Sequence, residues 1–169
     1  MNIALIGCRG VGKTSIGRLL ARDLDKKLIS TDEEIEKKAK LSIDKLIKKY
    51  GKEKFRDIES DVVESISNFD ECVFDTSNSI VLRNENIVNL KKSSLIILLT
   101  ADVKTLTSRI KNSMVPYTTK ICYINELKDF LQEHEYRYKR AADYTIDTTS
   151  LSPEEVCNLI SHFIQMELQ

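Results

Sequence analysis

Residues 7–14 decide the fold, and they read Gly7-Cys8-Arg9-Gly10-Val11-Gly12-Lys13-Thr14. This stretch matches the pattern GxxxxGK[ST] and lies between the apolar run 3–6 and a segment with apolar residues at helical spacing. Between a strand and a helix, the pattern forms a loop whose glycines let backbone N–H groups approach phosphate oxygens. The following helix adds its positive N-terminal end. The motif therefore predicts a phosphate-binding loop that holds a nucleotide.

Two side chains of this motif carry charge or metal chemistry. Lys13 supplies a positive charge to the β and γ phosphates, and the Thr14 hydroxyl is placed to ligate Mg²⁺. We therefore expect ATP and Mg²⁺ as cofactors. The motif does not identify the phosphoryl acceptor. The residues predicted to bind the nucleotide from this loop are Gly7, Gly10, Val11, Gly12, Lys13, Thr14 and Ser15.

Short apolar runs alternate with helical patterns on both sides of the loop, which is typical of a parallel sheet flanked by helices. We expect one α/β domain over residues 1–169, with three layers and a five-stranded parallel sheet. The predicted strands are residues 3–6, 27–30, 72–75, 95–99 and 144–147. The first predicted helix begins near residue 12, and two more lie within 32–50, separated by a break near 40–42. A longer helix follows Gly51. Further helices are predicted at 101–111, at 121–140 and from about Pro153 onward.

Composition excludes several classes of protein. The 169 residues carry 26 Lys and Arg against 26 Asp and Glu, so no overall field favours a nucleic acid or an anionic membrane. No apolar run reaches the roughly 18 residues of a membrane helix, and no basic leader precedes the first strand. The four cysteines lie far apart, without zinc or disulfide spacing. We expect a cytoplasmic monomer that acts on a small molecule.

Two aspartates follow predicted strands at the edge of the sheet where ligands of such folds bind. Asp32 is a candidate catalytic residue that aligns a substrate hydroxyl or accepts its proton; the alternative is an N-cap for a helix beginning near Glu33. Asp75 is a candidate ligand of Mg²⁺ or of its water. Its alternative is a turn residue at the end of a strand.

Arg56 and Glu59 are three residues apart on a predicted helix, so Glu59 is placed to orient the guanidinium for a carboxylate or phosphate ligand. The alternative is an ordinary surface pair. The polar stretch around Pro116 is the candidate lid, at about 111–121. The lid is flanked by basic residues, one of which could close over the transferred phosphoryl group. These basic residues are Arg109, Lys111, Lys120, Arg137 and Arg140. His134 has no partner visible in the sequence, which favours a structural role.

Three blocks in this order and spacing resemble the shikimate kinase family: the phosphate loop with its helix, residues 31–36 reading TDEEIE, and residues 51–59 reading GKEKFRDIE. The resemblance implies transfer of the γ-phosphoryl group of ATP to the 3-hydroxyl of shikimate. By this resemblance, Asp32 holds the acceptor hydroxyl, Arg56 binds the shikimate carboxylate and Glu59 supports Arg56. These residues lie in an acceptor-binding region at about 32–62. It also places Arg109 and the loop at Asp147 against the two faces of adenine.

The chain departs from the family pattern in the acceptor half. Ser77-Asn78-Ser79 stands where the family has three glycines, and Val115 stands where it has a lid arginine. His134 occupies the position of a second carboxylate-binding arginine, and Arg137 is a nearby substitute. Ser30 replaces an acidic residue on the magnesium side, for which Asp75 could compensate. Asn78, His134 and Arg137 therefore join the predicted substrate-binding set.

Two functions remain open from the sequence. The first is a small-molecule kinase acting on shikimate or another hydroxy acid, in which the Ser77-Asn78-Ser79 segment makes new contacts. The second is a nucleotide-binding protein that no longer phosphorylates shikimate and acts as a regulator; Val115 and the same segment favour it. A nucleotide or gluconate kinase is disfavoured because residues 55–59 resemble the shikimate group.

Overall fold

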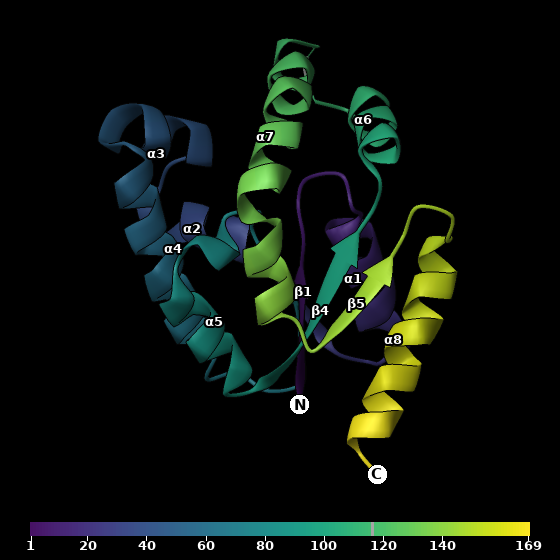
Figure 1. Ribbon diagram of the computed structural model, residues 1–169. Helices are drawn as coiled ribbons and strands as arrows, with labels where there is room; N and C mark the ends of the chain where they lie inside the picture. The colour runs from purple at the N-terminus through teal and green to yellow at the C-terminus, as the bar shows by residue number, and fades with distance from the viewer. Residues whose placement is uncertain (116) are drawn as a thin grey trace.

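The computed structural model describes residues 1–115 and 117–169 and contains a five-stranded parallel sheet in the order β2-β3-β1-β4-β5 (Figure 1). Its strands lie where the sequence predicted them. Ile3 is paired with Val73 on one side and with Leu95 on the other, so β1 is the central strand. The strands are β1 (Asn2–Ile6), β2 (Lys27–Ser30), β3 (Cys72–Asp75), β4 (Ser94–Thr100) and β5 (Tyr144–Asp147).

Helices connect the strands, and most of them match the predicted helices. They are α1 (Lys13–Asp23), α2 (Thr31–Ala39), α3 (Ile43–Tyr50), α4 (Lys52–Ile66), the 3₁₀ helix η1 (Ile80–Leu82), α5 (Asn84–Lys91), α6 (Val103–Lys111), α7 (Tyr117–Ala141) and α8 (Pro153–Glu167). None of the described helices is long and apolar enough to span a membrane.

Alternation along β1 divides the core into two halves. Ile3 and Leu5 face α1 and α8 on one side, whereas Ala4 and Ile6 face α4, α5 and α7 on the other. Helices therefore cover both faces of the sheet, as Figure 1 shows, and this makes the predicted three layers. Burial on both faces explains why the inner strands β1, β3 and β4 are largely continuous apolar runs and not alternating ones.

Local signals fix several helix ends. Ser152 and Glu155 form a capping box with Pro153 in the first turn of α8, as expected. The break at residues 40–42 arises because Lys40 adopts a left-handed conformation at the end of α2. The alternative role considered for Asp32 is wrong, since the Ser30 side chain caps α2 by accepting from the Glu33 amide.

The structure differs from the sequence prediction in two regions. No element was predicted for residues 76–94, which hold η1 and α5; only three large apolar side chains there are well buried, too few for a clear period. The candidate lid at 111–121 is partly helical, since α6 ends at Lys111 and α7 begins at Tyr117. Pro116, at the centre of the predicted lid, lies outside the described residues.

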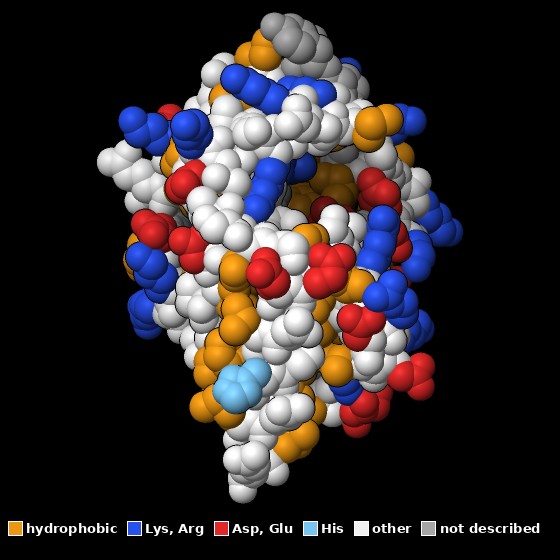
Figure 2. Space-filling model, turned by 90° about the vertical axis from the view of Figure 1, so that its right-hand side faces the viewer, with side chains coloured by type: hydrophobic (Ala, Val, Ile, Leu, Met, Phe, Trp, Pro, Cys, Tyr) orange, Lys and Arg blue, Asp and Glu red, His pale blue; other side chains and the backbone are white. Residues whose placement is uncertain are grey.

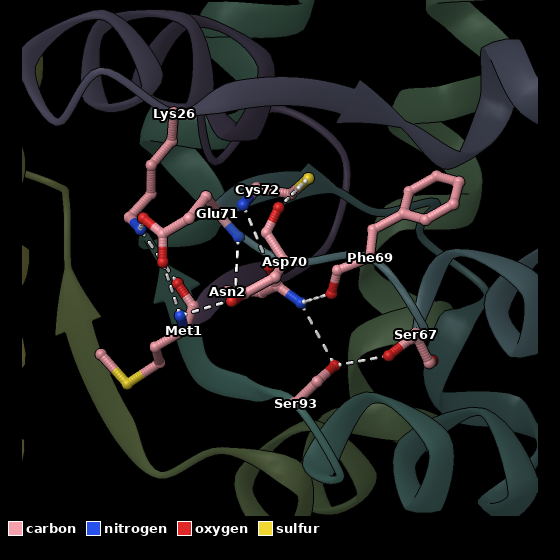
Figure 3. Close-up of polar contacts among 9 residues, drawn as sticks. All are labelled: Met1, Asn2, Lys26, Ser67, Phe69, Asp70, Glu71, Cys72 and Ser93. Carbon is pink, nitrogen blue, oxygen red and sulfur yellow. Dashed lines mark hydrogen bonds and ion pairs between the residues drawn. The ribbon is translucent and has the colours of Figure 1, made fainter.

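At the edge of the sheet opposite the phosphate loop, the Asn2 side chain joins three segments (Figure 3). Its amide group donates to the Phe69 carbonyl at 2.7 Å and to the Ser93 hydroxyl at 3.2 Å, and its carbonyl accepts from the Cys72 amide at 2.9 Å. Asn2 is fully buried. Beside it, the Met1 ammonium group pairs with Asp70 and Glu71 at the surface.

We expect Asn2→Ala to lower the free energy of unfolding by about 2–4 kcal/mol, because it leaves buried donors and acceptors without partners. Urea unfolding followed by circular dichroism measures the change. Asn112→Ala, at an exposed position after α6, is the control and should cost less than about 0.5 kcal/mol. Equal stability of the two variants would contradict the role given to Asn2.

Candidate active site

The phosphate loop lies between β1 and α1, at the carboxyl edge of the sheet. Gly7 has φ 146°, and a Cβ there would lie 2.5 Å from the Leu99 carbonyl oxygen, so only glycine allows the loop to pass this close to β4. Gly12 has φ 97° directly before α1. Both positions therefore require glycine for the geometry that points backbone N–H groups at a phosphate.

The Lys13 side chain is held inside this loop. Its ammonium group donates to the Gly7 carbonyl at 2.6 Å, to the Cys8 carbonyl at 3.2 Å and to Asn78 Oδ1 at 3.0 Å. Burial lowers the pKa of Lys13 to about 8, although the nearby Asp75 carboxylate opposes this shift. Anionic phosphate groups beside the ammonium group would favour its charged form.

Thr14 and Asp75 form a pair of oxygen donors at the mouth of the loop. The Thr14 hydroxyl donates to Asp75 Oδ2 at 2.6 Å, and the Asp75 side chain is almost fully buried at the end of β3. One hydroxyl and one carboxylate fit Mg²⁺, which binds few protein groups and completes its octahedron with phosphate oxygens and water. The described residues contain no cluster of three or more metal-binding side chains, so the phosphates would have to supply the remaining ligands.

A cleft of about 770 Å³ opens from the loop along the sheet edge. In Figure 2 it is the hollow in the upper half of the molecule, with basic side chains at its rim. The cleft brings together most of the predicted nucleotide-side residues. It is lined by Gly10, Val11, Gly12, Lys13, Thr14, Ser15, Asp32, Asp75, Asn78 and Arg109, together with Arg9, Arg18, Thr148 and Pro153.

Arg109 and the loop after β5 close one end of this cleft. The guanidinium group donates to the Gly10 carbonyl, to the Thr148 hydroxyl and to the Thr148 carbonyl at 2.9–3.2 Å. Asp147 does not line the cleft: its carboxylate accepts from the Thr149 amide and hydroxyl. Thr148, buried beside the loop, is one of the cleft residues that the sequence did not predict, as are Arg9, Arg18 and Pro153. Threonine in a loop gives no signal in the sequence.

Asp32 lies in the first turn of α2 and lines the cleft. Its side chain opens into the cleft, yet the walls remove much of the water around it. This partial desolvation, together with the charge of Asp75, raises the pKa of Asp32, while Lys13 opposes the shift. A carboxylate with a raised pKa is a better proton acceptor than an ordinary aspartate.

A second, smaller cavity of about 240 Å³ adjoins the cleft, and Arg9 and Asn78 line both. Its walls are mostly apolar and include Phe55 and Phe130. Arg56, about one third exposed, supplies one of its positive charges, and Lys52 supplies another. The cavity therefore suits a small molecule that has an apolar face and an anionic group.

The predicted support of Arg56 by Glu59 is wrong for this structure. Arg56 pairs with Glu53 at 2.9 Å, one turn earlier on α4. Glu59 is fully buried and accepts hydrogen bonds from the Ser77 hydroxyl and, at 2.7 Å, from the Ser79 hydroxyl. Burial raises the pKa of Glu59, and the two hydroxyl groups oppose the shift. The serines redirect Glu59 because their hydroxyls reach it inside the core.

Comparisons with known proteins agree with this geometry. Residues 9–165 match the family model for shikimate kinase. The chain is 37% identical to a shikimate kinase of Thermodesulfovibrio yellowstonii, over 94% of this chain and 92% of that protein. The structure superposes on a shikimate kinase of Acinetobacter baumannii in complex with shikimate, with a TM-score of 0.86, 27% identity and coverage of 98% and 93%. The chain belongs to the shikimate kinase family.

His134 and its predicted substitute Arg137, both expected to bind the substrate, lie away from both cavities. His134 packs edge-on against Phe130 with ring centroids 4.7 Å apart, and burial lowers its pKa. The Arg137 guanidinium lies over the Tyr136 ring at 5.4 Å. His134 Nδ1 and Arg137 Nε are buried without a hydrogen-bond partner among the described residues. The structure thus does not bring either residue to the cavity that Arg56 lines.

The buried state of Lys13 predicts a pH dependence. Above about pH 8, Lys13 loses its proton in the free protein but stays protonated when nucleotide phosphates are bound beside it. Nucleotide binding above this pH is therefore accompanied by uptake of a proton. We expect the affinity for ADP to fall about tenfold between about pH 7 and about pH 9. Calorimetric titration in buffers of different ionisation heat measures the affinity and the proton uptake. In Lys13→Met both effects should disappear; if they persist, another group is responsible.

Proposed function

We propose that this protein is an ATP-dependent shikimate kinase that forms ADP and shikimate 3-phosphate. The proposal rests on two adjoining cavities. One is built on the phosphate loop, the other is lined by Arg56, and Arg9 and Asn78 line both. A donor site and an anion-binding acceptor site that share a wall suit direct transfer between two bound molecules. Membership of the family supports shikimate as the acceptor.

On the donor side, each group binds one part of MgATP. Backbone N–H groups of residues 10–14 and the Lys13 ammonium group hold the β and γ phosphates. Arg109, tied to the Thr148 loop, forms a wall for adenine. Thr14 and Asp75 would hold Mg²⁺, which supplies positive charge to the phosphate oxygens.

On the acceptor side, Asp32 aligns the 3-hydroxyl and accepts its proton, for which its raised pKa suits it. Arg56 binds the shikimate carboxylate as a charged partner. Asn78 lies between the two cavities, where its side chain contacts Lys13 and its backbone carbonyl accepts from the Tyr138 hydroxyl. His134 and Arg137 of α7 line neither cavity, so neither is assigned a contact with the substrate.

The remaining parts of the proposal concern organisation and setting. Residues 1–169 act as one monomeric kinase domain, with the acceptor region at about 32–62 and the lid at about 111–121. All four cysteines are unpaired, which suits a reducing, cytoplasmic setting. The overall balance of charge supports a small-molecule substrate and neither nucleic acid nor membrane as a partner.

The first test is release of ADP by the purified protein with MgATP, with and without shikimate. We expect release that depends on shikimate and that falls by a factor of about 10³ in Lys13→Ala, because the charge on the β and γ phosphates is lost. Binding of nucleotide without shikimate-dependent release would contradict the proposal. Dependence on a different hydroxy acid would then identify another acceptor, and dependence on none would favour a regulatory nucleotide-binding protein.

The assignment of Arg56 gives a second, more local prediction. We expect Arg56→Met to raise the KM for shikimate about 30-fold or more, with the KM for ATP changed less than about threefold, because a charge-assisted hydrogen bond is lost only on the acceptor side. Steady-state kinetics with each substrate varied in turn measures both constants. Arg22→Met, which removes an exposed arginine that pairs with Asp23, is the matched control. An equal rise in both constants would place Arg56 outside the acceptor site.

A further inference from the structure

We propose that Arg9 is a catalytic residue whose guanidinium group stabilises negative charge on the phosphoryl group during transfer. This role rests on the proposed function. It identifies Arg9 as the cation that contacts the transferring phosphoryl group from the acceptor side. Arg9 is the third residue of the phosphate loop, and its side chain is exposed. Among the arginines and lysines in the described part of the chain, Arg9 alone lines both the cleft and the second cavity.

A stacking contact orients the Arg9 side chain. Its guanidinium carbon lies 3.6 Å from the centroid of the Tyr123 ring on α7, and Tyr123 lines the second cavity. Stacking on an aromatic face holds the planar group in one orientation and leaves its N–H groups directed outward around the edge. The contact also links the phosphate loop to α7, the helix that follows the predicted lid.

The positive charge of Arg9 acts on both Lys13 and Asp32, the groups proposed to lie on either side of the transferred phosphoryl group. Its positive charge contributes to lowering the pKa of Lys13 and opposes the rise in the pKa of Asp32. Arg9 lines the same cleft as the Lys13 ammonium group on the donor side and the Asp32 carboxylate on the acceptor side. A phosphoryl group that moves from one to the other passes through the field of this guanidinium.

Three other cations that line the cavities already have partners: Lys13 donates to Gly7, Cys8 and Asn78, Arg109 donates to Gly10 and Thr148, and Arg56 pairs with Glu53. Arg18 and Lys52 have no such partner among the described residues, but each lines only one of the two cavities. Arg9 makes no hydrogen bond or ion pair with the rest of the described chain. Its donors are therefore available to the equatorial oxygens of a transferring phosphoryl group, where charge accumulates.

The step balances with the groups already named. The oxygen of the acceptor hydroxyl forms a bond to the γ-phosphorus, and the bond between that phosphorus and the β–γ bridging oxygen breaks. The electron pair of the broken bond remains on the terminal β-phosphate oxygen of ADP, and the hydroxyl proton passes to Asp32. Arg9 exchanges neither protons nor electrons and contributes only charge and hydrogen bonds.

The test compares Arg9→Met and Arg9→Lys with Arg22→Met in the full chain. We expect kcat of Arg9→Met to fall about 100-fold or more, with partial recovery in Arg9→Lys and no change in Arg22→Met. The Kd for MgADP should change less than about threefold, because the loop and Lys13 bind the ground state. A kcat within about threefold of that of the unsubstituted protein would overturn the proposal.

A binding experiment tests the role of Arg9 without relying on turnover of shikimate. MgADP with aluminium fluoride mimics the transferring phosphoryl group, so Arg9→Met should weaken its binding about 100-fold while MgADP alone binds as before. If the unsubstituted protein shows no shikimate-dependent turnover, the proposed function fails, and this comparison still tests Arg9. Equal affinity of both proteins for the mimic would overturn the role of Arg9.

Tyr123 is the corresponding positioning residue. Tyr123→Leu removes the ring beneath Arg9 and should lower kcat about tenfold, with less than about a threefold change in either KM. Tyr123→Phe keeps the ring and should restore most of the lost kcat. In the Arg9→Met background, Tyr123→Leu should have little further effect on kcat, and a full additional loss there would show that Tyr123 acts through another group.

Discussion

The buried ammonium group of Lys13 is the interaction on which the site depends. An ammonium group without water needs acceptors, and it finds two carbonyls of its own loop and the side-chain oxygen of Asn78 after β3. Asn78 is fixed in turn by Tyr138 of α7, which donates to its backbone carbonyl. One charge thereby connects the central strand, the strand beside it and the helix that lines the second cavity. The cleft and the second cavity are joined through this chain of contacts.

The Ser77-Asn78-Ser79 segment determines which partners Glu59 and Arg56 have. The two serine hydroxyls bind Glu59, which could otherwise bond to the guanidinium of Arg56 one turn away on the same helix. Arg56 bonds to Glu53 instead and lines the second cavity. Exchange of an exposed partner such as Glu53 for a ligand carboxylate costs little, because a surface ion pair is weak. The Arg56 guanidinium therefore remains available at the wall of the second cavity.

The sequence predicted the five strands, the phosphate loop and the Thr14 and Asp75 pair because these depend on local patterns and on parallel strands ending at one edge. The roles of Glu59 and Asp147 were harder to predict. Helical spacing places Glu59 near Arg56, but only the packed core brings two hydroxyl groups to its carboxylate. Asp147 was expected to face adenine, yet Thr149, two residues on, binds its carboxylate. Competing partners from distant or adjacent turns carry no periodic signal.

A cation on the phosphate loop differs physically from a cation on a lid. A lid residue must become ordered in each catalytic cycle, which costs side-chain and backbone entropy. Arg9 belongs to a loop in which Gly7 packs against β4, and its guanidinium already stacks on Tyr123. Electrostatic stabilisation is most effective when the charges are in place before the reaction, because little reorganisation is then required. Arg9 is therefore a cation already in place at the junction of the two cavities.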